Sequence, residues 1–256
     1  MDKHNVKLSA DNLQLTGEIY FPQGESSHPT LCICHGIPAR ISDTQDKGYP
    51  LLAETFCNQG FCVLIFNFRG CGESEGNLDI TGWNKDLEAA IDYLYSLGKA
   101  DKSRLSLLGF SGGAAVSVYR AAQDKRVSAV VTCASPVRFS NITDLERMES
   151  LIEQCRQVGT IRDQSFPPSI HEWVRGFEEA SPVKWIRQIS PRPILIIHGD
   201  RDQVCPPDDA WALYHEAKKP KDISIIKGGE HRLRLNDLAM STALSWLKKV
   251  NGLTNA

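Results

Sequence analysis

The chain has 256 residues, of which 41% are hydrophobic and 23% charged, and its formal net charge is -2. These proportions are those of an ordinary globular domain, so they exclude disordered and fibrous proteins. Because the charges nearly balance, we expect neither nucleic acid nor an anionic membrane as a partner. Residues 1–9 lack the apolar core of a signal peptide, and no later apolar run approaches the ~20 residues that span a bilayer, so we expect a cytoplasmic protein.

Several of the eight cysteines, including Cys32, Cys34 and Cys133, lie inside apolar runs. In a cytoplasmic chain of this length they are expected to be reduced and buried rather than paired in disulfides. Cys32, Cys34 and His35 have the chemistry of metal ligands, but an apolar strand that ends in a glycine explains their spacing better. We therefore expect no metal and no cofactor.

The first half of the chain alternates strand and helix patterns. Residues 6–8 and 13–21 alternate apolar and polar side chains around Ala10-Asp11-Asn12, which predicts an antiparallel hairpin at a sheet edge. Strands are then expected at 30–36, 61–70, 104–110 and 127–133. Helices are expected between them, at 50–58, at 86–97 and directly after Ser111. This alternation predicts a mostly parallel sheet covered by helices on both faces.

Residues 136–192 interrupt this order with short amphipathic stretches at 144–158, 169–177 and 183–189. They contain too few apolar residues to bury a core of their own, so they predict an insertion in one domain that spans 1–256. Because the insertion follows the C-terminal end of a parallel strand, we expect it to form a small helical cap over that edge of the sheet, where α/β proteins place their functional groups. The sheet pattern resumes with a strand, a helix, a strand and a helix at 193–199, 208–218, 222–226 and 235–250.

Ser111 lies in Gly109-Phe110-Ser111-Gly112-Gly113, between an apolar run and residues that favour helix. On such a strand-to-helix turn the serine oxygen is held clear of the sheet, and the flanking glycines let strand and helix pack closely. The pattern by itself is common, because glycine and serine also serve ordinary turns. Its position between a strand and a helix makes Ser111 the candidate nucleophile.

A serine nucleophile needs an imidazole to accept its proton and a carboxylate to orient that imidazole. Among the seven histidines, His231 lies in a glycine-rich loop after the last predicted strand, whereas His35 and His198 end apolar runs and are expected to bond the backbone. Asp200 and Asp202 follow a parallel strand at the sheet edge where α/β proteins place catalytic groups. Asp200 is close enough to the strand to cap its turn.

The chain resembles the α/β-hydrolase superfamily over nearly its whole length apart from the insertion. The resemblance rests on three motifs, which are His35-Gly36, Gly109-x-Ser111-x-Gly113, and His198-Gly199-x-x-Asp202-x-x-x-Pro206 followed by Gly229-x-His231. It implies that Ser111 is the nucleophile, His231 the base and Asp202 the acid. It also implies an oxyanion hole made by the backbone N–H groups of Ile37 and Gly112.

The stretch from Asn67 to Ser74, with Gly82-Trp83 and Asp86, is most similar to small cytosolic esterases of the cinnamoyl-esterase and serine-aminopeptidase-like branch. Asn67 departs from the aspartate usual at that position, and Gly112 is unusually small. The resemblance implies a mostly parallel, twisted sheet of about eight strands with helices on both faces and a helical cap.

The expected function is a serine hydrolase that cleaves a small carboxylic ester through an acyl-enzyme, with a small acyl compound as its partner. A thioester or a small peptide or amide is the second choice, and a non-catalytic ligand receptor on the same fold is the alternative of another class. The intact serine, histidine and aspartate argue against the receptor. Phe139, Trp173 and Phe177 of the insertion are candidates either to line an acyl or aryl pocket or only to anchor the insertion. The oligomeric state stays open.

Overall fold

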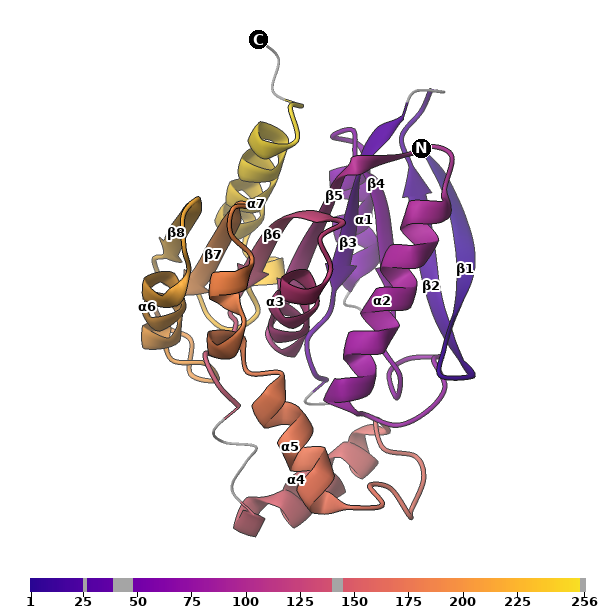
Figure 1. The fold of residues 1–256 in the computed structure, drawn as a ribbon, viewed down its shortest axis with the longest axis vertical. Helices are drawn as coiled ribbons and strands as arrows, with labels where there is room; N and C mark the ends of the chain where they lie inside the picture. The colour runs from indigo at the N-terminus through magenta and orange to yellow at the C-terminus, as the bar shows by residue number, and fades with distance from the viewer. Residues whose placement is uncertain (25–26, 39–47, 140–144, 254–256) are drawn as a thin grey trace.

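In the part of the chain that the structure describes, one eight-stranded sheet runs through the molecule, with helices on both of its faces (Figure 1). The computed structural model describes residues 1–24, 27–38, 48–139 and 145–253. The strands lie side by side in the order β1-β2-β4-β3-β5-β6-β7-β8. They are β1 (Asp2–Ala10), β2 (Leu13–Phe21), β3 (His28–Cys34), β4 (Cys62–Phe66), β5 (Ala100–Phe110), β6 (Val127–Cys133), β7 (Ile194–Gly199) and β8 (Lys221–Ile226).

The N-terminal hairpin forms one edge of this sheet, as expected. β1 pairs with β2 and β2 with β4 in antiparallel fashion, while every pair from β4 to β8 is parallel. Asp11 and Asn12 at the hairpin turn have φ values of 50° and 64°. Two successive positive φ values are typical of the two-residue turn whose twist matches that of the strands. The predicted α/β class and the mostly parallel sheet are therefore confirmed.

The described part of the chain also contains seven α-helices and three short 3-10 helices. They are α1 (Gly48–Cys57), α2 (Ile80–Ser96), α3 (Gly112–Gln123), α4 (Leu145–Val158), α5 (Ile170–Glu179), η1 (Pro182–Lys184), η2 (Ile186–Gln188), α6 (Pro207–Glu216), η3 (Leu233–Leu235) and α7 (Asp237–Val250). Of these, η3 and α7 follow the last strand. Helix α2 starts earlier than the predicted range 86–97. The side chain of Asp79 accepts hydrogen bonds from two backbone N–H groups of its first turn, and this cap sets the start.

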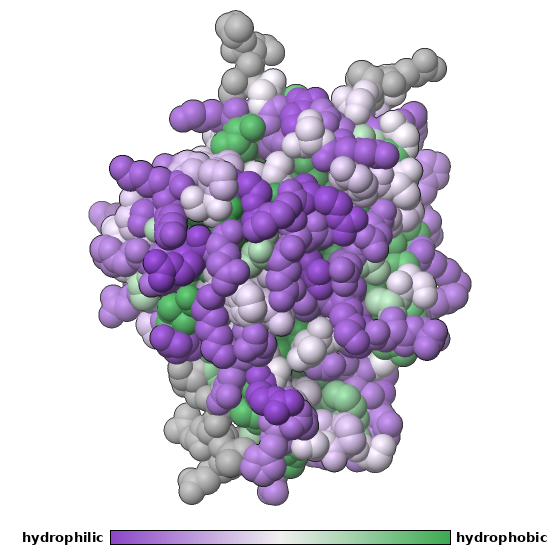
Figure 2. Space-filling model, in the orientation of Figure 1, coloured by the Kyte–Doolittle hydropathy of each residue, from purple (hydrophilic) through white to green (hydrophobic). Residues whose placement is uncertain are grey.

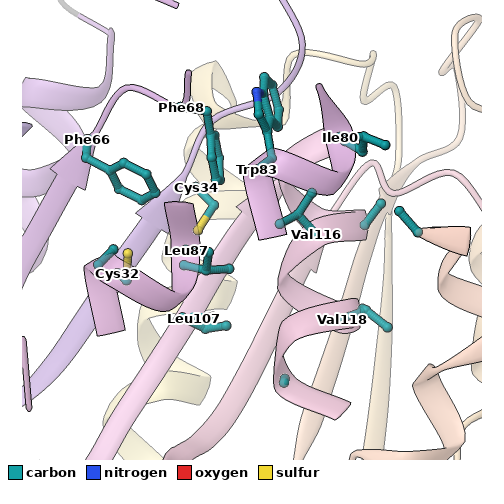
Figure 3. Close-up of a cluster of buried hydrophobic side chains, with 14 of the residues drawn as sticks. Cys32, Cys34, Phe66, Phe68, Ile80, Trp83, Leu87, Leu107, Val116 and Val118 are labelled. Carbon is teal, nitrogen blue, oxygen red and sulfur yellow. The ribbon is translucent and has the colours of Figure 1, made fainter. Parts of the chain in front are cut away.

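Alternating side chains of the central strands divide the core into two layers. Cys32 and Leu107 belong to the layer shared with α2, α3 and α6, whereas Ile33 and Leu108 belong to the layer shared with α1 and α7. Figure 3 shows the first layer, where the strand residues face Leu87 of α2. Because both faces are covered, the buried parts of the central strands are apolar on both sides, which is why their sequences contain continuous apolar runs.

Helices α4 and α5 of the insertion lie together beyond one end of the sheet, apart from the other helices (Figure 1). The guanidinium of Arg162 donates to the carbonyl oxygens of Ser74 and Gly72 at 2.7 and 2.6 Å. The N–H of Leu78 donates to the carbonyl of Thr160 at 2.8 Å. These contacts fasten the insertion to the segment that precedes α2. That residues 136–192 form one cap in a single domain remains a prediction.

The face of the molecule drawn in Figure 2 is mostly hydrophilic, with hydrophobic residues in small separate areas. Single apolar side chains on a polar surface are normal and need no partner. None of the helices in the described ranges is both long and apolar enough to cross a membrane.

Candidate active site

Ser111 lies at the turn between β5 and α3 in a strained backbone conformation. Its φ and ψ are 51° and -121°, a region that residues with a side chain rarely adopt. Its N–H donates to the carbonyl of Cys133 at 2.9 Å, which ties the turn to the end of β6. A Cβ on Gly109 would lie 2.5 Å from the backbone of α3, and one on Gly113 would lie 2.2 Å from the carbonyl oxygen of His35. The turn therefore requires both glycines.

Ser111, His231 and Asp202 come from three separate loops and meet in one chain of contacts. Nε2 of His231 lies 3.0 Å from Oγ of Ser111, and Nδ1 lies 2.9 Å from Oδ2 of Asp202. Because a carboxylate only accepts, Nδ1 carries the proton in this arrangement and Nε2 is left to accept from the serine hydroxyl. The side chain of His231 is 22% exposed and that of Asp202 is 0% exposed. The imidazole is thus partly exposed to solvent, whereas the carboxylate is buried.

Asp202 is held as a buried anion. Burial by itself raises the pKa of this carboxyl, but contacts from His198 and His231 and two backbone hydrogen bonds outweigh burial and hold the pKa well below its usual value. The two backbone donors are the N–H groups of Val204 and Cys205, each 2.9 Å from Oδ1. The carboxylate is therefore ionised at neutral pH and suited to stabilise a charged imidazole.

The loops that follow β7 and β8 are fastened to each other. A Cβ on Gly199 would lie 2.2 Å from the carbonyl oxygen of Gly229, so the two backbones touch. Oδ1 of Asp200 accepts a hydrogen bond of 2.6 Å from the N–H of Gly228. Asp200 thus bonds the backbone of the neighbouring loop, whereas the other candidate aspartate bonds His231.

The predicted oxyanion residues Ile37 and Gly112 lie against each other beside Ser111. A Cβ on Gly112 would lie 2.8 Å from Cγ1 of Ile37 and 3.5 Å from its backbone nitrogen, which explains the small residue. A Cβ on Gly36 would lie 3.0 Å from Cβ of Ser111. Gly112 is the first residue of α3, where helix N–H groups lack partners within the helix and carry partial positive charge. That these N–H groups bind an oxyanion remains a prediction.

His35 braces the turn that carries Gly36 and Ile37. Its Nδ1 donates to the carbonyl of Gly36 at 2.8 Å, and its Nε2 accepts from the N–H of Phe68 at 3.1 Å. This pair of contacts needs the neutral imidazole, and burial lowers the pKa of His35 to about 4. The expected backbone-bonding role is confirmed, but the sequence did not indicate that His35 would link two different loops.

Arg69 anchors the loop that follows β4. Its Nε and Nη2 lie 2.9 and 2.6 Å from Oδ1 of Asp86, and its backbone N–H donates to Oδ2 at 2.9 Å. The indole N–H of Trp83 donates to the carbonyl of Arg69 at 3.1 Å. A Cβ on Gly82 would lie 2.3 Å from Nη1 of Arg69. These contacts give a structural reason for the spacing of the esterase-like stretch.

Phe139, Trp173 and Phe177 form one aromatic cluster. The ring of Phe177 stands edge-on to the other two, with centroids 5.2 and 4.9 Å away. The indole N–H of Trp173 donates to the carbonyl of Leu78 at 2.8 Å, just before α2. All three side chains are buried, with exposed fractions of 6%, 4% and 0% in chain order. They anchor the insertion, and that any of them lines a substrate pocket remains a prediction.

A cavity of ≈ 470 Å³ lies between the N-terminal hairpin, β4 and the start of α1. His35 and Tyr49 are among its lining residues, but Ser111 and His231 are not, so it does not mark where a substrate would meet the serine. All eight cysteines are free and buried. Within the described ranges, no group of three or more His, Cys, Asp or Glu side chains is arranged to hold a metal ion.

The fold and this geometry define a class of protein. A sequence model of the alpha/beta hydrolase fold matches residues 29–159, and the chain belongs to that family. The uncharacterized protein YfhR of Salmonella typhi is 33% identical, over 82% of this chain and 67% of YfhR. Thiohydrolase aneE of Aspergillus aculeatus is 25% identical, over 88% of this chain and 84% of aneE.

The fold is also similar to that of the alpha/beta hydrolase GrgF from Penicillium sp. sh18. The two structures superpose with a TM-score of 0.77 at 21% identity, covering 98% of this chain and 100% of GrgF. Family membership and the hydrolases among its relatives support hydrolase activity.

Proposed function

We propose that this protein is a serine hydrolase that cleaves a small carboxylic ester through an acyl-enzyme intermediate. The observation that carries the proposal is the unbroken set of contacts from Oγ of Ser111 through His231 to Asp202. A serine hydroxyl is a weak nucleophile until a base takes its proton, and this arrangement supplies the base and its orienting carboxylate.

In the proposed reaction Oγ of Ser111 attacks the carbonyl carbon of the ester while Nε2 of His231 accepts the hydroxyl proton. The N–H groups of Ile37 and Gly112 stabilise the oxyanion of the tetrahedral intermediate. His231 then gives the proton to the departing alkoxide, which leaves as an alcohol. Water, deprotonated by the same imidazole, releases the acid and restores the serine. Throughout, the buried anion Asp202 stabilises the imidazolium.

A thioester is the second candidate substrate, and the similarity to thiohydrolase aneE favours it. The same groups serve both reactions, because both pass through a tetrahedral oxyanion on the serine. The two differ in the leaving group: a thiolate departs with less help from an acid than an alkoxide does, because thiols are the stronger acids. The preferred acyl group and leaving group must therefore be determined with a panel of substrates.

A ligand receptor on the same fold would bind without chemistry. Such a receptor has no need of a strained serine in contact with a histidine whose other nitrogen bonds a buried carboxylate. These three features together favour the enzyme, since fold alone does not decide function.

The test is a panel of acyl esters, acyl thioesters and aminoacyl amides, run with the purified protein and its Ser111→Ala variant. We expect ester hydrolysis that falls by orders of magnitude in Ser111→Ala. A serine-directed phosphonate probe should label the parent and spare the variant. Hydrolysis by the variant within about tenfold of the parent would contradict the proposal.

A further inference from the structure

His198, at the end of β7, lies behind the candidate site and takes no part in the reaction proposed above. Its side chain is 0% exposed. Its Nε2 lies 3.0 Å from the carbonyl oxygen of Cys205 and 3.3 Å from Oδ2 of Asp202. Both neighbours of this nitrogen are acceptors, so Nε2 carries the hydrogen. The other nitrogen, Nδ1, has no hydrogen-bond partner among the described residues.

The carboxylate of Asp202 is consequently surrounded by donors on both oxygens. Oδ1 accepts from the N–H groups of Val204 and Cys205, both at 2.9 Å, and also lies 3.1 Å from Nδ1 of His231. Oδ2 faces two imidazoles, that of His231 at 2.9 Å and that of His198 at 3.3 Å. The backbone hydrogen bonds to Oδ1 hold the carboxylate in place. The N–H groups of both histidines therefore interact with the negative charge on the same oxygen, Oδ2.

We propose that His198 is a positioning residue for the triad, a second imidazole partner of Asp202 that shares Oδ2 with His231 and so sets how strongly this carboxylate stabilises the charged base. The inference rests on the proposed function for its kinetic consequence, but the contact itself belongs to the folded protein. His198 does not touch the reacting atoms, and its effect passes through Asp202.

The direction of this effect follows from electrostatics. An N–H next to Oδ2 neutralises part of the negative charge that the oxygen would otherwise present to His231. Without that N–H, the carboxylate stabilises the imidazolium more strongly, and His231 holds its proton to higher pH. Since the reaction needs the neutral imidazole, the acid limb of the kcat/KM profile would then move to higher pH.

Among the described residues, Asp209 of α6 interacts with the charges of His198 and Asp202, and it is followed by Cys205, which interacts with Asp202, and Asp208, which interacts with Asp209. Burial raises the pKa of Asp209, which also lies close enough to His198 and Asp202 to interact with their charges. Burial raises the pKa of the Cys205 thiol to about 12, so it stays neutral in the range of the assay. All of these groups are left unchanged in the variants below, so differences among the variants report His198.

Three substitutions distinguish the effect of the N–H donor from the effect of the side chain's volume. His198→Gln places an amide N–H at the distance of Nε2 and keeps the donor. His198→Asn has the same amide one methylene closer to the backbone, so it cannot reach Oδ2. His198→Leu fills the space without any donor. The glutamine and asparagine variants are the matched pair.

We expect the acid limb of kcat/KM to move upward by about half a pH unit or more in His198→Asn and His198→Leu, and to stay with the parent in His198→Gln. A residue that only packs would lower the amount of folded enzyme without moving the limb. An unmoved limb in the asparagine and leucine variants, or a limb that moves downward, would overturn the inference.

The second measurement needs no substrate. Histidine NMR of the Ser111→Ala protein reports the midpoint of the His231 titration and the tautomer of His198. We expect the midpoint to rise with His198→Asn and His198→Leu but not with His198→Gln, and we expect hydrogen on Nε2 of His198 in the parent. Hydrogen on Nδ1 alone would overturn the inference even if no variant folds. If these NMR results hold but no ester or thioester is cleaved, the proposed function fails and the contact stands.

Discussion

Oδ1 of Asp200 accepts a 2.6 Å hydrogen bond from the backbone N–H of Gly228, so the loop after β7 is tied to the loop that carries His231. Two residues further on, Asp202 bonds the imidazole of His231 itself at 2.9 Å. Two aspartates of one short loop therefore have separate roles. The first bonds the backbone of the neighbouring loop, and the second bonds the imidazole of the proposed base.

This division predicts that two matched substitutions affect different properties of the protein. Asp202→Asn should lower kcat by roughly four orders of magnitude, because an amide cannot hold the imidazole in the required tautomer. Asp200→Asn keeps an oxygen that can accept from Gly228 and should leave kcat within about tenfold, with a loss of about 1 kcal/mol in unfolding free energy. Kinetics and urea unfolding of both variants check this. The reverse ranking in folded proteins would show that the catalytic aspartate is misassigned.

The contact between Gly112 and Ile37 predicts a coupled pair of substitutions. Gly112→Ala adds a Cβ that would lie 2.8 Å from Cγ1 of Ile37, so the loop must shift and carry its N–H away from the oxyanion position. We expect a loss of about a hundredfold in kcat, typical for one oxyanion donor. Adding Ile37→Ala removes the clash and should recover most of the loss, which a double-mutant cycle measures. Additive losses in the double variant would argue against the clash.

His35 predicts a stability change with pH. Burial lowers its pKa from 6.5 to about 4, so between these values the unfolded chain binds a proton that the folded chain does not. Stability contributed by the neutral imidazole is therefore complete above pH 6.5 and is lost as the pH falls toward 4, by about 3 kcal/mol in all.

Unfolding free energies measured across this range check the prediction. Burial also lowers the pKa of His28, so the parent alone does not isolate His35. The control is His35→Gln, whose amide oxygen can still accept from Phe68 but does not titrate. Its stability should fall less steeply with decreasing pH, and equal slopes would show that other groups dominate.

The proposed cap predicts a change in substrate preference. We expect Phe139→Ala, Trp173→Ala or Phe177→Ala to alter the ranking of kcat/KM across acyl chain lengths and aryl esters, because aromatic side chains commonly wall such pockets. Phe177 is 0% exposed, so its truncation should also cost about 3–5 kcal/mol of stability.

The control for the cap is Trp185→Phe. The indole N–H of Trp185 donates to the carbonyl of Glu179 at 2.6 Å, and its ring lies 4.7 Å from that of Tyr119. This residue anchors the end of the insertion, and its replacement should leave the ranking unchanged. If the three alanine variants fold and also keep the parent ranking, the insertion only covers the site.

Periodicity and turn chemistry in the sequence predicted most of the fold. Apolar runs identified the strands buried on both faces, because a strand covered by helices on both sides has no polar face to show. The two glycines around Ser111 predicted the turn on which it lies, because no larger residue fits there. These are properties of neighbouring residues, so a single stretch of chain contains them. The start of α2 was placed wrongly, because it depends on the cap of Asp79 and not on apolar spacing.

The tertiary structure alone decided which side chains meet. Ser111 and His231 are 120 residues apart, and their contact depends on the order of β5 and β8 in the sheet. Both Asp200 and Asp202 follow the strand in sequence, and only the motif resemblance favoured Asp202; in the structure Asp200 bonds the next loop instead. The place of His198 behind Asp202 was not indicated by any local pattern. Strand order and loop register set these distances, and neither is contained in the periodicity of any one segment.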